Sequence, residues 1–428
     1  MKNIIQFILK KLSQTILKKY QPKIIGVSGN VGKTSAKEAI CTVLASQFQI
    51  RKNIKNYNNE IGVPLTIIGE KSAGKSILGW FIIFLKGLKL IIIRYGGYPD
   101  ILILELGVDR PKDMEYLTKF IYCQIAVMTA IGEIPVHIEF FKNAKDLIKE
   151  KSILVKSLPE NGLAILNSDD PSILEMKELT KAKILSYGFG ENADLKAENV
   201  SYYFNERGNF NNLGGINFKI NYQGHIVPFQ LKNILGRHQI YPVLAAIAVG
   251  LNFGLNLVEI SESIKNYQPP AGRMRLINGI KNTIIVDDTY NSSPSATLAA
   301  LDALINFKAK RRIAVLGDMF ELGRHTEETH RKVGEKVAQI CDLFFGVGNR
   351  MIFALEEAEK YGMYGTHLFH AKTSDEIKFK VQEKIQQGDI ILVKGSQGMR
   401  MERVILEIMA EPEKAEELLV RQEEGWKK

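Results

Sequence analysis

The first 22 residues have the apolar pattern of a helix with one hydrophobic face. Their isoleucines and leucines recur three and four positions apart, and the other positions include five lysines and no acidic residue. The pattern predicts a basic amphipathic helix over residues 1–22, which either docks on the body of the protein or lies on an anionic membrane surface. A cleaved signal peptide is not expected, because lysines interrupt the apolar run and no small-residue cleavage site follows.

The most apolar stretch of the chain is residues 76–95, SILGWFIIFLKGLKLIIIRY. Lys86 and Lys89 interrupt it, so that no unbroken apolar run reaches the roughly 18 to 20 residues that a bilayer span requires. We therefore expect a helix that packs on the body of the protein or sits in a membrane interface. Together with residues 1–22 it would form a paired anchor.

Short apolar runs separated by helix-sized intervals predict two α/β units. The first unit is expected to hold strands at 24–27, 101–104 and 125–129, and helices at 144–158 and 236–250. Alternating segments with Asn- and Gly-rich turns predict antiparallel hairpins over 190–231. The second unit is expected to be a doubly wound sheet, with strands at 283–286, 312–316, 343–347 and 390–393.

Residues 23–37, KIIGVSGNVGKTSAK, combine an apolar strand, a glycine-rich turn and the start of a helix. Gly29 and Gly32 would let the backbone approach a phosphate closely, and Lys33 would offer a cation to the β- and γ-phosphates. Thr34 would offer its hydroxyl to Mg²⁺, and the N-terminal amides of the helix would point at the anion. The spacing departs from the strict P-loop pattern, since Val27 stands where its first glycine would be. We expect a nucleotide site rather than an ordinary glycine turn.

A domain boundary is expected where two prolines and a glycine, Pro269, Pro270 and Gly272, interrupt the pattern. The fold class is thus predicted as α/β, with a P-loop ATPase domain built on a mostly parallel sheet and a Rossmann-like, doubly wound C-terminal domain. The expected segments are the helix 1–22, the central domain 23–270 with a hydrophobic insert (70–98) and the hairpin region (190–231), the C-terminal domain 271–410, and a charged, solvated helical tail (411–428) without an assigned function.

The composition narrows the range of functions. With 428 residues and 45% hydrophobic residues, the chain can bury a sizeable core. Its three cysteines are far apart and form no C-x-x-C pair, which argues against a disulfide framework or a zinc site and fits a reducing cytoplasm. The net charge of +10 is compatible with phosphate-rich substrates, and no basic patch interleaved with aromatic residues indicates nucleic acid.

Further candidates for metal chemistry follow the predicted strands. Glu105 ends an apolar strand, the position at which α/β nucleotide enzymes keep a carboxylate for Mg²⁺. His137 follows the next strand after a loop, where a lone histidine is more often structural than catalytic. Beyond it, a predicted helix carries Lys149 and Lys151.

Taken together, these motifs resemble those of the Mur ligases, the ATP-dependent amide-forming enzymes of peptidoglycan precursor synthesis. The resemblance runs from about residue 23 to residue 405. Three of the motifs point to the member that adds D-alanyl-D-alanine to UDP-N-acetylmuramoyl-tripeptide, namely NYNNEIGVPLT (56–66), DDTYNSSP (287–294) and GDMFELG (317–323). The others are GVSGNVGKTS (26–35), LELGVDRP (104–111), GRHQ (236–239), AGRM (271–274) and VKGS (393–396).

The resemblance implies a reaction in which ATP phosphorylates a substrate carboxylate, an amine attacks the acyl phosphate, and phosphate leaves from a tetrahedral intermediate. Catalytic roles would fall to Lys33, His137 and Lys151. Two Mg²⁺ ions would be held by Thr34, Glu105, His137 and Lys151, the last as a carbamate. ATP would be bound by Gly29, Asn30, Gly32, Lys33, Thr34, Asn59, Gln239, Arg273, Asp288, Tyr290 and Asn291.

Position in the family pattern implies more specific roles for several residues. Counting fourteen residues on from His137 reaches Lys151 as the carbamate site, with Lys149 and an ordinary solvated lysine as the alternatives. Asp288 would lie near the ribose and Arg273 on the phosphates. Lys394 and Ser396, at the end of a C-terminal strand, are candidates for holding the incoming amine, or else form a structural turn.

The sequence departs from the family pattern in four places. The N-terminal domain that grips the UDP-sugar is expected to be absent, because about 22 residues precede the P-loop strand. Roughly 25 extra residues, including the apolar stretch, lie between Thr66 and Glu105. The loop TAIGEIPVH is two residues longer than usual, with Ala130 in place of asparagine. In GRHQIYP, Gln239 and Pro242 replace two asparagines, and Pro242 has no side-chain hydrogen-bonding group.

The expected protein is thus a cytoplasmic, monomeric ligase of cell-wall biogenesis, and hence of cell shape and division. It would contact the inner face of the membrane through 1–22 and 76–95. Two alternatives remain open. One is a folylpolyglutamate-type or other amino-acid ligase, against which the asparagine-rich loop and GDMFELG argue. The other is a nucleotide-dependent, membrane-associated binding protein without ligase activity, which the joint presence of Glu105, His137 and Lys151 disfavours.

Overall fold

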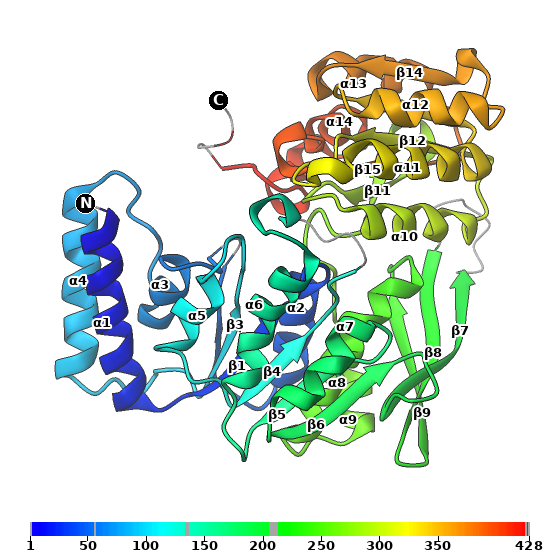
Figure 1. The fold of residues 1–428 in the computed structure, drawn as a ribbon. Coiled ribbons are helices and arrows are strands. Elements are labelled where there is room, and N and C mark those ends of the chain that lie inside the picture. Colours follow the sequence, from blue (N-terminus) through cyan, green and yellow to red (C-terminus); the bar gives the residue numbers. More distant parts are fainter. Residues whose placement is uncertain (1, 55–56, 133–136, 205–212, 424–425, 427–428) are drawn as a thin grey trace.

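The computed structural model of the protein describes residues 2–54, 57–132, 137–204, 213–423 and 426. Parts of five stretches considered above lie outside the described residues. They are residue 1 of the predicted helix 1–22, Asn56 of NYNNEIGVPLT, residues 133–136 of TAIGEIPVH, residues 205–212 of the hairpin region, and residues 424–425 and 427–428 of the tail. The chain forms two sheets, one above the other in Figure 1, each with helices on both faces. The predicted α/β class, with a mostly parallel sheet in each unit, is confirmed.

The first sheet has nine strands in the order β2-β3-β1-β4-β5-β6-β7-β8-β9. Strands β1 to β6 run parallel, β7 continues parallel to β6, and the hairpins β7-β8 and β8-β9 are antiparallel, as expected for residues 190–231. The strands are β1 (Lys23–Ser28), β2 (Ile50–Lys52), β3 (Ile101–Glu105), β4 (Ile125–Met128), β5 (Leu163–Asn167), β6 (Lys183–Gly188), β7 (Leu195–Phe204), β8 (Leu213–Tyr222) and β9 (His225–Lys232).

The second sheet has six strands in the order β10-β11-β15-β12-β13-β14. Only β10 is antiparallel to its neighbour, so the sheet is doubly wound as predicted. Its strands are β10 (Arg275–Gly279), β11 (Thr283–Asp288), β12 (Arg311–Gly317), β13 (Leu343–Val347), β14 (Leu368–Ala371) and β15 (Asp389–Lys394).

The helices cover both faces of each sheet, and the alternation of side chains along β1 explains how. Ile25 and Val27 belong to the core under α2 and α8, whereas Ile24 belongs to the core on the opposite face. The helices of the first unit are α1 (Lys2–Tyr20), α2 (Lys33–Leu44), α3 (Gly62–Ile68), α4 (Ile77–Ile92), α5 (Asp113–Thr118), α6 (Ala144–Lys156), α7 (Pro171–Leu174), α8 (Ile240–Asn252) and α9 (Leu257–Ile264). Those of the second are α10 (Pro294–Ile305), α11 (Thr326–Ile340), α12 (Met351–Lys360), α13 (Ser374–Lys384), α14 (Glu402–Ile408) and α15 (Ala415–Leu418).

The N-terminal helix α1 docks on the body of the protein and lies beside α4 at the edge of the molecule (Figure 1). Leu9 and Ile16 are fully buried, and Leu12 packs against the backbone of α4 at Gly87. Lys19 donates hydrogen bonds to two carbonyl oxygens near the end of α4. Among the described residues, no helix is long and apolar enough to cross a membrane.

The apolar segment that follows the asparagine-rich loop forms the buried helix α3. The tail differs from the expectation. Its described part is not a solvated helix, because it packs on the C-terminal domain and buries Leu419 and Arg421. Its apolar residues are too few to produce a periodic pattern, so the contact could not be predicted from the sequence.

Candidate active site

The glycine-rich turn after β1 has the backbone geometry that a phosphate-binding loop requires. Gly29 and Gly32 have φ values of 142° and 86°. A Cβ atom at Gly29 would lie 2.1 Å from Oγ1 of Thr129, so no other residue fits there. Gly32 caps α2, whose first amides therefore face the loop.

Lys33 is the first residue of α2, and its side chain reaches back to the glycine-rich turn. Its Nζ donates hydrogen bonds to the carbonyl oxygens of Gly29, at 3.0 Å, and Asn30, at 3.3 Å. Burial lowers the pKa of Lys33, although the carboxylate of Glu105 acts in the opposite direction. The ammonium group is thus held at the loop by backbone oxygens alone, and a bound anion would offset its desolvation.

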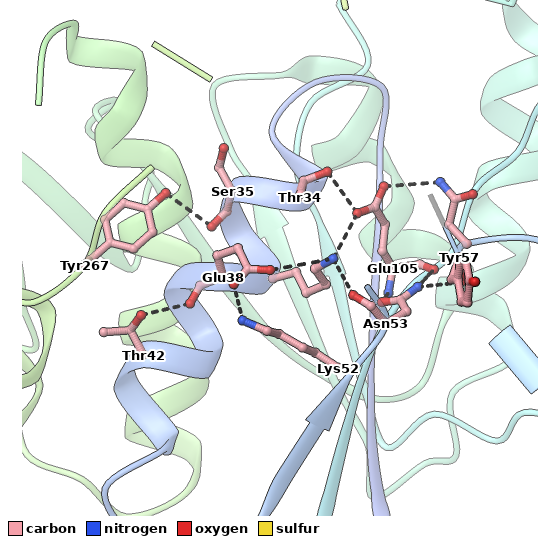
Figure 2. A network of polar contacts seen from close by, with 11 residues as sticks. Thr34, Ser35, Glu38, Thr42, Lys52, Asn53, Tyr57, Glu105 and Tyr267 are labelled. Carbon is pink, nitrogen blue, oxygen red and sulfur yellow. Dashed lines mark hydrogen bonds and ion pairs between the residues drawn. The ribbon is translucent and has the colours of Figure 1, made fainter. Parts of the chain in front are cut away.

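Glu105, at the end of β3, accepts a hydrogen bond from the hydroxyl of Thr34 at 2.9 Å (Figure 2). Its other carboxylate oxygen accepts from the amide of Asn58 at 3.2 Å. The backbone of Glu105 is fixed by Asn53, whose side chain accepts from its N–H and donates to its C=O, each at 2.8 Å. The carboxylate and the hydroxyl predicted to hold Mg²⁺ therefore lie side by side.

Lys37, which the sequence did not single out, completes this network. Its side chain is fully buried, donates to the carbonyl oxygen of Asn53 at 2.7 Å and lies 3.8 Å from the Glu105 carboxylate. Lys37 follows Lys33 by one helical turn, which is a signal that could have found it. It compensates the charge of a carboxylate that is only 4% exposed.

The two lysines proposed as alternatives on α6 have opposite surroundings. Lys151 is buried, and its Nζ donates to the carbonyl oxygen of Gly29 at 3.1 Å, whereas Lys149 is exposed. Burial lowers the pKa of Lys151 well below its ordinary value, and the positive charge of Lys33 lowers it further. The environment of Lys151 thus favours a neutral amine against the phosphate-binding loop.

His137 lies between two carboxylates from different parts of the chain. Its Nδ1 is 2.7 Å from Oε2 of Glu321, which belongs to the C-terminal domain, and its Nε2 is 3.5 Å from Oδ1 of Asp109. The first contact is short, although its angles are not those of a hydrogen bond. It holds the pKa of Glu321 below its ordinary value. The sequence did not indicate either partner, because neither is near His137 in the chain.

The C-terminal domain brings Arg273 to the same place. Its guanidinium stacks on the ring of Tyr290, 4.1 Å from the centroid, and its Nε is buried without a hydrogen-bond partner among the described residues. Asp287 accepts hydrogen bonds from the backbone of Gly272 and from the backbone and hydroxyl of Thr289. Asp287, which the sequence did not single out, thereby fixes the turn that carries Arg273.

Asp288 and Lys394 form a buried ion pair, with Nζ 2.6 Å from Oδ2. Lys394 also donates to the carbonyl oxygen of Asn291 at 2.9 Å, and burial lowers its pKa. Both charges are therefore engaged within the protein, although Asp288 was expected at a ribose and Lys394 at an incoming amine. Ser396 accepts a hydrogen bond from the N–H of Phe320 at 2.9 Å.

One cleft of about 540 Å³ between the two sheets collects most of the predicted residues. Its lining includes Asn30, Lys33, Asn59, Glu105, His137, Arg273, Tyr290, Asn291 and Ser396. The predicted residues that do not line it are Gly29, Gly32, Thr34, Lys151, Gln239, Asp288 and Lys394. Of these, Gln239 is buried at the start of α8, and its Oε1 has no hydrogen-bond partner among the described residues.

The tail also reaches this cleft. Trp426 lines it, and Arg421 donates to the carbonyl oxygens of Thr289 and Tyr290 and to Glu402. The tail therefore supports the loop on which Tyr290 lies.

The residues of the cleft fit a nucleotide with Mg²⁺. The cationic groups of Lys33 and Arg273, with the unpartnered Nε–H of Arg273, are arranged for an anion. Over the described part of the chain, no three His, Cys, Asp or Glu side chains are grouped as a metal site. Mg²⁺ commonly uses one or two protein oxygens together with phosphate oxygens, and Thr34 and Glu105 can supply the former.

Comparison with known proteins identifies both halves of the chain. Residues 93–250 match the Mur ligase middle domain, and residues 272–397 match the Mur ligase, glutamate ligase domain. The chain belongs to the Mur ligase family. The family resemblance and the class of enzyme expected from the sequence, an ATP-dependent ligase, are thereby confirmed.

The relatives of this Mur ligase carry a common name. The UDP-N-acetylmuramoyl-tripeptide--D-alanyl-D-alanine ligase of Bacillus subtilis is 26% identical over 406 residues, which cover 94% of this chain and 79% of that protein. The enzyme of the same name from Haemophilus influenzae is 28% identical over 410 residues, which cover 93% and 79%. The crystal structure of the MurF ligase of Thermotoga maritima in complex with ADP superposes with a TM-score of 0.77 at 24% identity and covers 96% of this chain and 84% of that one.

Proposed function

We propose that this Mur ligase joins D-alanyl-D-alanine to UDP-N-acetylmuramoyl-tripeptide, with ATP as the energy source, in peptidoglycan precursor synthesis. The relatives of that name align with more than nine-tenths of the chain. The observation that carries the proposal is the meeting, in one cleft, of Lys33 and Glu105 from the first unit with Arg273 from the second. Such a cleft can hold a triphosphate between two domains while excluding water from the reacting groups.

The chemistry needs charge compensation more than it needs a nucleophilic side chain. A tripeptide carboxylate oxygen attacks the γ-phosphorus of ATP, which gives an acyl phosphate and ADP. The amine of the dipeptide then attacks the acyl carbon, loses a proton, and expels phosphate as the amide forms. Lys33 and Arg273 would neutralise the charge that develops on the phosphoryl oxygens. Mg²⁺, where bound, would add further charge compensation at Thr34 and Glu105.

The carbamate on Lys151 belongs to the same proposal. A carbamate forms when a neutral amine attacks CO₂ and releases a proton, and the buried environment of Lys151 favours that neutral form. The product is anionic, which would reverse the charge beside Lys33 and give a second Mg²⁺ a ligand in addition to His137. Lys149 is exposed and lacks this environment.

Binding of the nucleotide base and of the amine remains part of the proposal. Gln239, with its unpartnered oxygen, is proposed to lie against the adenine, and Tyr290 and Asn291 are proposed to line the nucleotide. Ser396 is proposed to face the amine, because it lines the cleft, whereas Lys394 would act by holding Asp288 in place. We further propose a cytoplasmic monomer that contacts the inner face of the membrane through 1–22 and 76–95.

Phosphate release tests the proposal against its alternatives. Purified protein with Mg-ATP would receive the UDP-linked tripeptide and D-alanyl-D-alanine, singly and together. Release that requires both supports the proposal. Release with folate and glutamate instead would favour a folylpolyglutamate-type ligase, and nucleotide binding without release under any combination would favour a binding protein. Lys33→Ala serves as the inactive control.

A further inference from the structure

Helix α4 exposes a row of large apolar side chains along its whole length. Ile77, Leu78, Phe81, Leu85, Leu88 and Ile92 are between 45% and 78% exposed. Their spacing of i, i+1, i+4, i+8, i+11 and i+15 puts them on one side of the helix. The row continues past the end of α4 into Ile93 and Tyr95, which are also exposed. We refer to these exposed side chains together as the apolar row of α4.

The opposite side of α4 is already occupied. Trp80, Ile83 and Gly87 are buried against the body of the protein and α1. The packing of α4 is therefore complete without the apolar row, so burial in the fold does not explain why these residues are apolar. Contiguous exposed apolar side chains of this extent mark an interaction site in a folded protein.

The charge around the apolar row is of one sign. Residues 2–22 and 71–94, which form α1, α4 and their flanks, contain ten lysine and arginine residues and no aspartate or glutamate. Lys86 is paired with Glu70 at 2.7 Å. By contrast, Lys75, Lys89 and Arg94 have no acidic partner within ion-pair distance among the described residues, and all three are exposed. An apolar row bordered by unpaired cations is complementary to a partner that has an apolar layer beneath a layer of anionic groups.

We propose that α4 binds in the plane of an anionic lipid bilayer, with its apolar row among the acyl chains and Lys75, Lys89 and Arg94 at the level of the lipid phosphates. Such a helix lies in the interface, and its affinity combines buried apolar area with attraction to anionic headgroups. A second copy of this chain fits the row less well, because pairing two rows would bring the cations of both copies together.

The binding surface is separate from the active site. No residue of α4 lines the cleft, and in Figure 1 α1 and α4 lie at the edge of the molecule remote from the C-terminal domain. The protein can therefore bind a bilayer through α4 with the cleft still open to solvent. The inference is independent of the ligase reaction, and each can fail without the other.

Sedimentation with lipid vesicles tests the inference. The full chain would be mixed at low salt with vesicles of phosphatidylcholine alone or with about one-third phosphatidylglycerol. We expect binding to the anionic vesicles to be at least about tenfold stronger, and to weaken as salt is added. The double variant Phe81→Glu/Leu85→Glu should bind anionic vesicles at least about tenfold more weakly, because the new carboxylates would lie among the acyl chains. Phe379→Glu, at an exposed phenylalanine of α13, is the matched control and should bind as the native protein does.

A depth measurement separates insertion from mere electrostatic attraction. Tryptophan introduced as Phe81→Trp should be quenched by lipids brominated on their acyl chains, whereas Phe379→Trp should not. Failure to bind anionic vesicles at low salt would overturn the inference, as would equal loss in both glutamate variants or an unquenched Phe81→Trp. Dimerisation that Phe81→Glu abolishes, without vesicle binding, would assign the row to a second copy. Circular dichroism of each variant checks that the fold is retained.

Discussion

The side chain of Lys151 donates a hydrogen bond to the carbonyl oxygen of Gly29, at 3.1 Å, from a helix that follows the glycine by more than a hundred residues in the chain. The bond fixes α6 against the phosphate-binding loop and keeps the amine out of water. This is the amine that becomes a carbamate under the proposed function.

Lys151→Ala is therefore expected to lower the rate of phosphate release at least about 100-fold, because the proposed second Mg²⁺ would lose its anionic ligand and could no longer neutralise the phosphoryl oxygens. Short carboxylic acids should restore part of the rate by taking the place of the carbamate. Lys149→Ala is the matched control, two residues away and exposed, and should keep full activity. Full activity in Lys151→Ala, or no rescue, would remove the carbamate from the account.

Glu321 is expected to orient His137. A carboxylate next to Nδ1 favours the tautomer whose lone pair is on Nε2, the arrangement usual for metal-binding histidines. Glu321→Gln should raise the Mg²⁺ concentration needed for half-maximal activity by about 10- to 100-fold. Glu328→Gln, on the exposed face of α11, should leave it unchanged. An unaltered Mg²⁺ requirement in Glu321→Gln would mean that the contact only joins the two domains.

The glycine-rich loop and the neighbouring side chains of Thr34 and Glu105 could be located from the sequence, because they belong to short contiguous motifs. Glu105 could be placed because the end of a parallel strand is visible in the apolar pattern. Glu321 was missed because it meets His137 only when the two domains come together, and Asp109 because it follows a different strand of the first sheet from His137. Asn53 was missed because a polar loop residue is ordinary until the fold buries it, and Lys37 because its helical spacing from Lys33 was not used.

The carboxyl group of Asp287 should make stability depend on pH. Burial raises its pKa from 3.8 to about 6, so between those values the folded protein retains a proton that the unfolded chain releases. Stability should therefore fall as pH rises through this window, by about 3 kcal/mol in total, and level off above it. In Asp287→Asn, the free energy of unfolding should lose this dependence on pH, which urea titrations between pH 4 and pH 7 would measure. Asp302→Asn, exposed on α10, should retain it, and an equal slope in both variants would contradict the assignment.

Arg421 should anchor the tail to the loop that carries Tyr290. Arg421→Ala leaves the carboxylate of Glu402, which is 1% exposed, with Arg400 as its remaining partner. We expect a loss of about 3 kcal/mol in the free energy of unfolding and weaker binding of ATP. Equilibrium unfolding and a nucleotide-binding titration measure the two effects. Glu413→Ala, in the exposed part of the tail, is the control, and comparable losses there would show that Arg421 has no special role.

The most direct test of the account is detection of the peptide bond itself. The protein would be incubated with Mg-ATP, the UDP-linked tripeptide and D-alanyl-D-alanine, and the masses of the products would be measured by mass spectrometry. We expect a UDP-linked pentapeptide with the native protein, none without ATP, and at most a trace with Lys33→Ala. ATP consumption without that product, or equal product from Lys33→Ala, would contradict it.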